Sequence, residues 1–383
     1  MFQTKIIIYP YYTTYFDTFI VFLIKLFFIM DKLIPFTNND LGKITNHRNG
    51  EIKFGEKMIT VPKGSDPLEF LASCEAKYVI FGIPEDIGIR ANYGRPGAAS
   101  AWKSAIKSIA NIQHNRFCKG NQIVILGTIN VADEMAEVAN LDFNDIDDRS
   151  KLSQLVDKID KEVSHLIFHI IKLGKIPIII GGGQNNAYGN IKGTALAKGK
   201  PINAINFDAH SDFRILEGRH NGNAFSYAFE EGFLNRYYVF GLHENHVTKS
   251  VLDSFKKLED RLQYVTYDSI RIRKEKEFEE EMQQASEFIN EESFGLEIDL
   301  GAIPNIASST MTLTGFSVEE LRQFVSYFGK FKNVSYLHLC EGAPELGEEK
   351  NDHLIGKIIG HLITDFIKSN HEKIIPQPEE LQN

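Results

Sequence analysis

The sequence predicts an α/β protein, a three-layer α/β/α domain with a mostly parallel sheet. Short apolar segments typical of buried strands alternate along the chain with longer segments of helical periodicity, which is the pattern of parallel sheets. The clearest unit has apolar strands at 176–180 and 202–207 and a helix-compatible segment at 187–198 between them. Polar residues follow both strands immediately, and open parallel sheets bind their ligands at the carboxyl ends of their strands.

The remaining elements are predicted in chain order from the same two periodicities. The strands are expected at 77–82, 122–127, 237–241, 263–267, 294–300 and 334–339. The best helix is expected at 152–173, where apolar residues recur every three or four positions before Gly174. His165 and His169 lie four residues apart in it, and we interpret them as packing residues rather than as a metal site. Further helices are expected after Ala98, at 273–290, from the Ser317 capping box to Phe328, and at 354–367.

Charge and cysteine content limit the classes of protein to be considered. The 383 residues carry a formal net charge of −9, and no basic stripe contradicts it, so we expect no nucleic acid as a partner. The cysteines are Cys74, Cys118 and Cys340, widely spaced and without a Cys-x-x-Cys pair. This usage is typical of the reducing cytoplasm and not of a disulfide framework or a zinc knuckle. We therefore expect a cytoplasmic protein in which the three cysteines are small buried hydrophobic residues.

Residues 1–29 form a strongly apolar and aromatic extension. Asp17 and Lys25 interrupt it and no small-residue cleavage site follows, so a signal peptide fits poorly. We favour a start of translation at Met30, which would make the extension an artefact of gene prediction, over a membrane-anchored enzyme. We expect residues 30–383 to form a single domain, with a membrane as partner only if the extension is translated.

Two charged clusters occur at the ends of strands that we expect to be neighbours in the sheet. Side chains of an extended segment alternate between its faces, so Asp208, His210 and Asp212 can point the same way. For the same reason, Glu297 and Asp299 share one face of their strand. Charged groups in an apolar strand are costly unless they are paired or bound to a metal. Four carboxylates and one imidazole favour Mn²⁺ or Mg²⁺ over zinc and, with two ions, predict metal-assisted hydrolysis.

These motifs, in this order and spacing, resemble the ureohydrolase superfamily, which includes arginase, agmatinase and formimidoylglutamase. The motifs are Gly181-Gly182-Gly183, Asp208-Ala209-His210-Ser211-Asp212, Glu297-Ile298-Asp299, Glu341-Gly342-Ala343-Pro344 and the loop at 94–98. They extend over most of residues 77–345, and the Asp-Ala-His-x-Asp element is highly specific. The resemblance implies the arginase-like three-layer fold, Mn²⁺ as the cofactor in one or two ions, a small amino-acid-derived substrate and a homo-oligomer.

The resemblance also assigns roles to the charged residues. Asp208 would bridge two Mn²⁺ ions, and His210 would bind one of them. Asp212 would bind the other ion and accept a hydrogen bond from the attacking hydroxide. Glu297 matches a second bridging ligand and Asp299 a further ligand. The pair of cations would make hydroxide available near neutral pH for attack on an amidine carbon, followed by loss of the nitrogen leaving group.

Four residues are candidates for binding the substrate. Glu341 matches the catalytic-site carboxylate that grips the amidine or guanidinium group in this superfamily. Arg214 resembles the formimidoylglutamase branch, and its guanidinium suits a substrate carboxylate. A surface salt bridge is the other interpretation of Arg214. His220 and Asn223 fall where that branch has its substrate loop and are weaker candidates.

Two positions of the metal shell depart from the superfamily's pattern. Gln184 stands where the superfamily has a ligand histidine, and a neutral amide oxygen is a weaker donor than imidazole. Glu297 stands where the superfamily has aspartate, and the extra methylene adds about 1.5 Å of length. We interpret these departures as a modified site, with a single metal as one form of it, in preference to a decayed one.

We therefore expect a metal-dependent hydrolase of a linear amidine C–N bond, with N-formimidoyl-L-glutamate as substrate and glutamate and formamide as products. This reaction belongs to histidine degradation. One alternative is a metal-poor pseudoenzyme that binds an amino-acid-like ligand or a partner subunit. The charged residues retained at Glu341 and Arg214 argue against it. The other alternative is a ureohydrolase that acts on a guanidino substrate and releases urea.

Overall fold

A ten-stranded sheet organises the described part of this computed structural model, which comprises residues 32–347 and 352–371. The strand order is β1-β4-β3-β5-β10-β9-β6-β7-β8, and β2 pairs with β4. Every strand pair with a defined register is parallel, which confirms the predicted sheet. The strands are β1 (Leu33–Pro35), β2 (Ile59–Thr60), β3 (Tyr78–Gly82), β4 (Ile123–Ile129), β5 (Ile176–Ile180), β6 (Ile202–Phe207), β7 (Leu234–Leu242), β8 (Leu262–Thr266), β9 (Phe294–Asp299) and β10 (Val334–Cys340).

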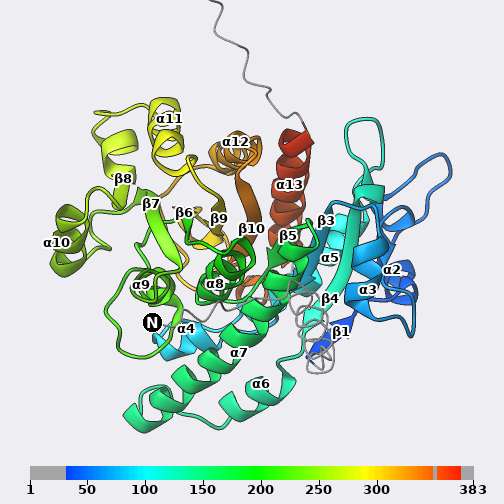
Figure 1. Cartoon of the computed structure of the whole chain (residues 1–383), viewed down its shortest axis with the longest axis horizontal. Helices are drawn as coiled ribbons and strands as arrows, with labels where there is room; N and C mark the ends of the chain where they lie inside the picture. Colours follow the sequence, from blue (N-terminus) through cyan, green and yellow to red (C-terminus); the bar gives the residue numbers. More distant parts are fainter. Residues whose placement is uncertain (1–31, 348–351, 372–383) are drawn as a thin grey trace, which may run out of the picture. The chain divides into compact units, whose positions relative to one another are not determined.

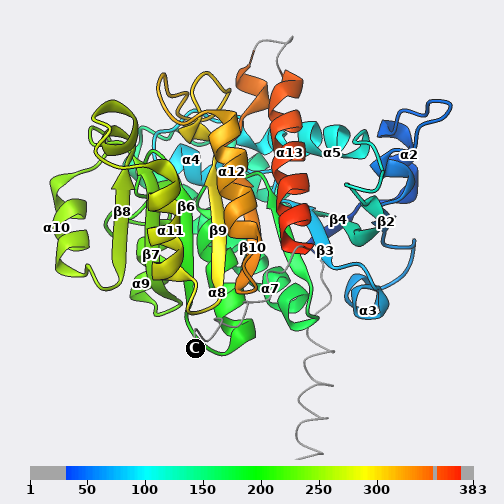
Figure 2. The same ribbon diagram turned by 90° about the horizontal axis from the view of Figure 1, so that it is seen from above.

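Helices cover both faces of the sheet, which confirms the three-layer α/β/α architecture (Figure 1). One face carries α7 (Ile146–Lys172), α8 (Asn186–Lys198) and α9 (Ala224–Glu230). The other face carries α11 (Phe278–Ile289), α12 (Val318–Gly329) and α13 (Asp352–His371), which lie in front of the strands in Figure 2. The remaining α-helices are α2 (Asn38–Ile44), α3 (Pro67–Ser73), α4 (Ile87–Ala91), α5 (Ala101–Ala110), α6 (Ala132–Val138) and α10 (Lys249–Lys257).

The apolar strands are buried on both faces, as continuous apolar runs in parallel sheets require. On the face of α11, α12 and α13, Ile180 and Phe207 belong to one large core cluster with Phe324 and Phe366. The rings of Phe207 and Phe324 have their centroids 4.9 Å apart. This packing holds the carboxyl ends of the central strands in place on one face of the sheet.

Several helix boundaries differ from those predicted. The longest helix begins at Ile146 rather than Leu152. The Asp145 side chain caps it by accepting hydrogen bonds from the backbone N–H groups of Asp147 and Asp148. The first turns of that helix are polar and carry no apolar periodicity, so the pattern missed them. The capping box of α12 is confirmed, with the Ser317 side chain accepting from the backbone N of Glu320.

Residues 1–29, with the predicted extension and its two explanations, lie outside the described residues. The described residues from Ile34 onward belong to one compact unit. Among the described helices, none combines the length and the apolar character that crossing a membrane requires.

Four adjacent strands, β5, β10, β9 and β6, bring the predicted motifs to the same edge of the sheet. The glycine-rich loop follows Ile180, Asp208 follows the end of β6, Asp299 ends β9, and Glu341 follows β10. Strands β6 and β9 pair directly, with Phe207 opposite Ile298. The two charged clusters therefore terminate neighbouring strands, as the sequence predicts.

Candidate metal and substrate site

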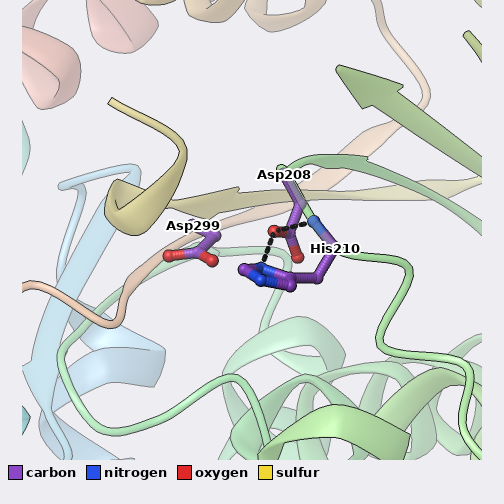
Figure 3. Close-up of side chains that lie close together, drawn as sticks. All are labelled: Asp208, His210 and Asp299. Atoms are coloured by element: carbon purple, nitrogen blue, oxygen red, sulfur yellow. Dashed lines mark hydrogen bonds and ion pairs between the residues drawn. The ribbon is translucent and has the colours of Figure 1, made fainter. Parts of the chain in front are cut away.

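Asp208, His210 and Asp299 form a group of potential metal ligands whose ligand atoms all lie within 4.8 Å of one another. Figure 3 shows the His210 ring next to the Asp208 carboxylate, with the Asp299 carboxylate close by. Oδ1 of Asp208 accepts a hydrogen bond from the backbone N of His210 at 2.7 Å, and Oδ2 accepts one from the Asn206 amide at 2.9 Å. Oδ1 of Asp299 accepts from the backbone N of Gly301 at 2.6 Å. These hydrogen bonds hold the two carboxylates in place at the ends of paired strands.

Like charges crowd this site. Burial, followed by the charges of Asp208 and Glu341, raises the pKa of Asp299 well above its ordinary value, and the same causes raise the pKa of Asp212. Burial by itself lowers the pKa of His210, but the hydrogen bond and charge of Asp208 raise it overall. A divalent cation would offset the repulsion between these carboxylates.

Residues 208–212 reach the site by a turn rather than by strand alternation. Strand β6 ends at Phe207, so the premise that Asp208, His210 and Asp212 share one strand face is wrong. The backbone of Asp212 has φ +43°, in the left-handed region that is costly for a residue with a side chain. Asp212 nevertheless lines the same cavity as His210 and Asp299.

Glu297 does not belong to the three-residue group. The Gln184 side chain instead donates from Nε2 to Oε2 of Glu297 at 3.0 Å. The Glu297 carboxylate also accepts hydrogen bonds from Tyr336 and His338, two residues of β10 that the sequence analysis did not identify.

Glu341 is held by donors from three separate segments. Its Oε1 accepts from the backbone N of Gln184 at 2.7 Å and from the Asn221 amide at 3.0 Å, and its Oε2 accepts from the Ser309 hydroxyl. The Glu341 side chain is buried, and burial raises its pKa despite these donors. Its backbone has φ +61°, so the chain turns sharply where β10 ends. The sequence analysis did not single out Asn221, which lies between His220 and Asn223 in the predicted substrate loop, and Ser309 belongs to no motif.

A cavity of about 200 Å³ joins these groups. Asp212, Asp299 and Glu341 line it together with Arg214 and Asn221. Carboxylates and a guanidinium therefore line the same cavity. His246, on the loop after β7, also lines the cavity, and its ring stacks on that of His210 with centroids 4.7 Å apart.

Arg214 lies at the exposed side of this cavity. Its Nη2 pairs with Oε1 of Glu217 at 2.7 Å, and its Nη1 donates to Oδ1 of Asn92 at 3.1 Å. The side chain is 51% exposed, so the guanidinium is accessible from solvent. The surface salt bridge and the position at the cavity are both present in the structure.

His220 and Asn223 lie outside the cavity lining and stabilise the loop that carries Asn221. His220 is buried, and its Nδ1 accepts from the backbone N of Gly222 at 3.1 Å. Asn223 accepts from Nη1 of Arg219 at 2.8 Å and donates to the carbonyl of Gly218 at 2.7 Å. Their geometry fits support of the loop rather than direct contact with a substrate.

Glu85, which the sequence analysis did not single out, stabilises the glycine-rich loop (residues 181–183) through buried hydrogen bonds. The carboxylate is completely buried and accepts from the Asn186 amide at 2.6 Å and the backbone N of Gly183 at 3.2 Å. It also accepts from the backbone N of Ile87 at 2.7 Å, which begins α4. Glu85 thereby holds the loop in place. The residue after the loop, Gln184, donates its backbone N–H to Glu341.

Two curated relatives illustrate what the sequence is similar to. Formimidoylglutamase from Chromobacterium violaceum is 29% identical over 184 residues, covering 47% of this chain and 52% of the relative. Formimidoylglutamase from Hahella chejuensis is 28% identical over 193 residues, covering 48% of this chain and 52% of the relative. The chain thus spans about half the length of these curated relatives.

Solved structures match over a longer part of the chain. Formimidoylglutamase from Bacillus subtilis superposes with a TM-score of 0.68 at 17% identity, covering 86% of this chain and 95% of that structure. Formiminoglutamase from Trypanosoma cruzi, solved with Mn²⁺, superposes with a TM-score of 0.64 at 17% identity, covering 82% and 98%. At these identities the likeness shows the fold. The model of the arginase family matches residues 76–364, most of the sequence, and the chain belongs to that family.

Proposed function

We propose that this chain is a metal-dependent hydrolase that cleaves the C–N bond of a linear amidine, with N-formimidoyl-L-glutamate as its substrate. The observation that carries the proposal is the shared cavity, which is lined by Glu341, by Arg214 and by two members of the metal-ligand group, His210 and Asp299. A carboxylate suits an amidine and a guanidinium suits a carboxylate, so the cavity matches both ends of this substrate. The relatives from Chromobacterium violaceum and Hahella chejuensis, both formimidoylglutamases, support the choice.

The residues present fit Mn²⁺. Two carboxylates and an imidazole form a mostly oxygen-donor set, and hard divalent cations such as Mn²⁺ prefer such sets. Asp208, His210 and Asp299 would hold the ion. When bound, the ion lowers the pKa of a coordinated water and so supplies a nucleophile near neutral pH. The Trypanosoma cruzi neighbour solved with Mn²⁺ supports this metal.

The remaining residues bind and orient the substrate. Glu341, held by Gln184, Asn221 and Ser309, accepts hydrogen bonds from the amidine N–H groups. Its fixed position orients the amidine carbon toward the metal-ligand group. Asp212 accepts a proton as water adds to that carbon. Collapse of the tetrahedral adduct with protonation of the glutamate nitrogen then gives glutamate and formamide.

The proposal extends to the cellular setting. All three cysteines are free thiols, which supports a reducing cytoplasm. Cys340 is buried as expected, whereas Cys74 and Cys118 are half-buried, so the expectation of three buried cysteines is wrong for those two. Assembly as a homo-oligomer rests on the family resemblance alone.

A substrate panel tests the proposal. The purified chain, incubated with Mn²⁺, is given N-formimidoyl-L-glutamate, arginine or agmatine, and formamide, urea and glutamate are quantified. We expect formamide and glutamate in equal amounts from the first compound and no urea from the other two. Urea from a guanidino compound would make the chain a ureohydrolase of another branch. No product from any compound, with Mn²⁺ bound, would favour the pseudoenzyme.

A further inference from the structure

We infer that the chain holds one metal ion, at Asp208, His210 and Asp299, and that a buried hydrogen-bond network centred on Glu297 occupies the place of a second ion. Glu297 and Gln184 are the two positions at which the sequence departs from the superfamily's metal shell. The inference rests on the proposed function for the identity of the metal, and the geometry of the side chains carries the rest.

Both carboxylate oxygens of Glu297 are engaged by protein donors. Oε1 accepts from the Tyr336 hydroxyl at 2.7 Å. Oε2 accepts from Nδ1 of His338 at 2.6 Å and from Nε2 of Gln184 at 3.0 Å. The side chain of Glu297 is fully buried, so these donors replace water completely. Both lone pairs of Oε2 are engaged, so a metal ion bound there would have to displace a well-formed buried hydrogen bond, which is costly because the donor would lose its partner.

The amide of Gln184 is engaged at both ends. Its Oε1 accepts from the thiol of Cys340 at 2.8 Å, while its Nε2 donates to Glu297. Because a carboxylate only accepts hydrogen bonds, the amide nitrogen must face Glu297 and the oxygen must face Cys340. The side-chain oxygen of Gln184, the atom of that amide that could bind a cation, therefore faces the Cys340 thiol.

The pairing of β9 and β10 builds this network. His338 stands opposite Glu297 in the parallel register, and Tyr336 stands opposite Gly295. A Cβ on Gly295 would lie 2.2 Å from the Tyr336 hydroxyl oxygen. The glycine therefore creates the space through which Tyr336 reaches Glu297. Two strands and a loop contribute to the network, which makes it part of the fold and not a chance contact.

The ligand group of Asp208, His210 and Asp299, unlike the Glu297 network, has oxygen and nitrogen atoms available for a cation. Oδ2 of Asp208 accepts from the Asn206 amide, which leaves it a lone pair for a cation. Oδ1 accepts from the His210 backbone and lies 3.4 Å from Nδ1 of the His210 ring, itself a candidate ligand. Asp299 and His210 line the open cavity, so an ion can reach them from solvent. One complete ligand group and one engaged network predict a single ion.

Metal stoichiometry tests the inference on the full chain with Mn²⁺ alone as the probe. After incubation with Mn²⁺ and gel filtration, elemental analysis measures the metal content, and electron paramagnetic resonance reports the environment of the bound ion. We expect about one Mn²⁺ per chain and the six-line spectrum of an isolated ion. About two ions per chain, or the spectrum of an exchange-coupled pair, would overturn the inference.

A matched pair of variants separates the network from the ligand group. Asp299→Asn should lose the ion. Glu297→Gln should keep the stoichiometry and change the Mn²⁺ dissociation constant by less than about threefold, whereas loss of a ligand or of its support costs tenfold or more. Glu297→Gln should also lower the midpoint of urea unfolding. The NH₂ group of the new amide would face a hydrogen-bond donor where the carboxylate offers an acceptor, and one buried hydrogen bond would be lost. Loss of the ion, or a rise in the dissociation constant of about tenfold or more, would overturn the inference.

Tyr336→Phe serves if Glu297→Gln does not fold, since it removes one donor and retains the carboxylate. It should bind about one Mn²⁺ with an unchanged affinity, and weakened binding would contradict the inference. The two proposals fail in different ways. One ion without amidine hydrolysis overturns the proposed function alone, and two ions with formamide release overturn this inference alone.

Discussion

Asn221 donates a hydrogen bond from its side-chain amide to Oε1 of Glu341 at 3.0 Å. Oδ1 of Asn221 accepts from the Asn92 amide at 2.8 Å, and Oδ1 of Asn92 accepts from Arg214 at 3.1 Å. A continuous chain of hydrogen bonds thus joins the carboxylate proposed to bind the amidine to the guanidinium proposed to bind the substrate carboxylate. Two asparagines set the distance between the two binding groups.

Asn221→Ala should lower kcat/KM for N-formimidoylglutamate by about tenfold, because Glu341 loses one of three donors and its orientation loosens. Steady-state kinetics measures the effect, and Mn²⁺ content should be unchanged because Asn221 is outside the ligand group. Asn144→Ala, at an exposed asparagine remote in sequence, is the control. Unchanged kinetics in Asn221→Ala would remove Asn221 from the substrate site.

Glu217→Gln should lower the KM for an amidine that carries a carboxylate. Glu217 and the substrate carboxylate compete for Arg214, whose Nη2 lies 2.7 Å from Oε1 of Glu217. The pair is largely exposed, so we expect only a change of about two- to fivefold. An amidine without a carboxylate should bind equally well to both proteins. A higher KM for the carboxylate substrate would mean that Glu217 positions Arg214 and does not compete for it.

The protein should lose stability as the pH falls below about 6.5, and His165 should account for part of the loss. Nε2 of His165 lies 2.9 Å from Nε2 of His169, so both rings cannot be protonated without repulsion. Burial and His169 lower the pKa of His165 to about 4. The unfolded chain therefore binds a proton between these pH values that the folded chain excludes, which favours unfolding as the pH falls.

Urea unfolding of the wild type and His165→Gln at pH 7 and pH 4.5 measures this contribution. The ring is partly exposed, so we expect the wild type to lose about 1–2 kcal/mol more of its free energy of unfolding than the variant. Equal losses in the two proteins would show that His165 titrates as it does in the unfolded chain.

Mn²⁺ should stabilise the folded chain. A ligand that binds only the folded state at a hundred times its dissociation constant adds about 2.7 kcal/mol, which corresponds to several degrees in Tm. Differential scanning calorimetry with Mn²⁺ and after chelation measures the shift. Asp208→Asn preserves the shape of the side chain and should abolish the shift. A full shift in that variant would place the ion elsewhere.

The fold could be predicted because its determinants are local. The buried strands of the central unit are apolar runs with abrupt polar ends, and parallel pairing brings those ends to one edge. This reasoning places Asp208, Asp299 and Glu341 together before any contact is known. The predicted placement at one edge of the sheet is confirmed for these three residues, each of which directly follows or ends a strand.

Contacts between distant segments could not be predicted in the same way. Glu297 shares its strand face with Asp299, yet its partners Tyr336 and His338 depend on the register between β9 and β10. Asn221 reaches Glu341 across 120 residues of sequence, and its loop had drawn interest for His220 and Asn223 instead. Single-sequence periodicity reports which face a residue occupies, but it does not report which donor stands opposite.

Hydrolysis of N-formimidoyl-L-glutamate in ¹⁸O-labelled water, with the Mn²⁺-loaded chain and product detection by mass spectrometry, tests the central claim most directly. Attack at the amidine carbon with departure of the glutamate nitrogen puts the label in formamide and leaves glutamate unlabelled. That is the predicted result. Labelled N-formylglutamate with ammonia would show that the other C–N bond breaks, and the absence of any product from chain that carries Mn²⁺ would contradict the assignment as an amidine hydrolase.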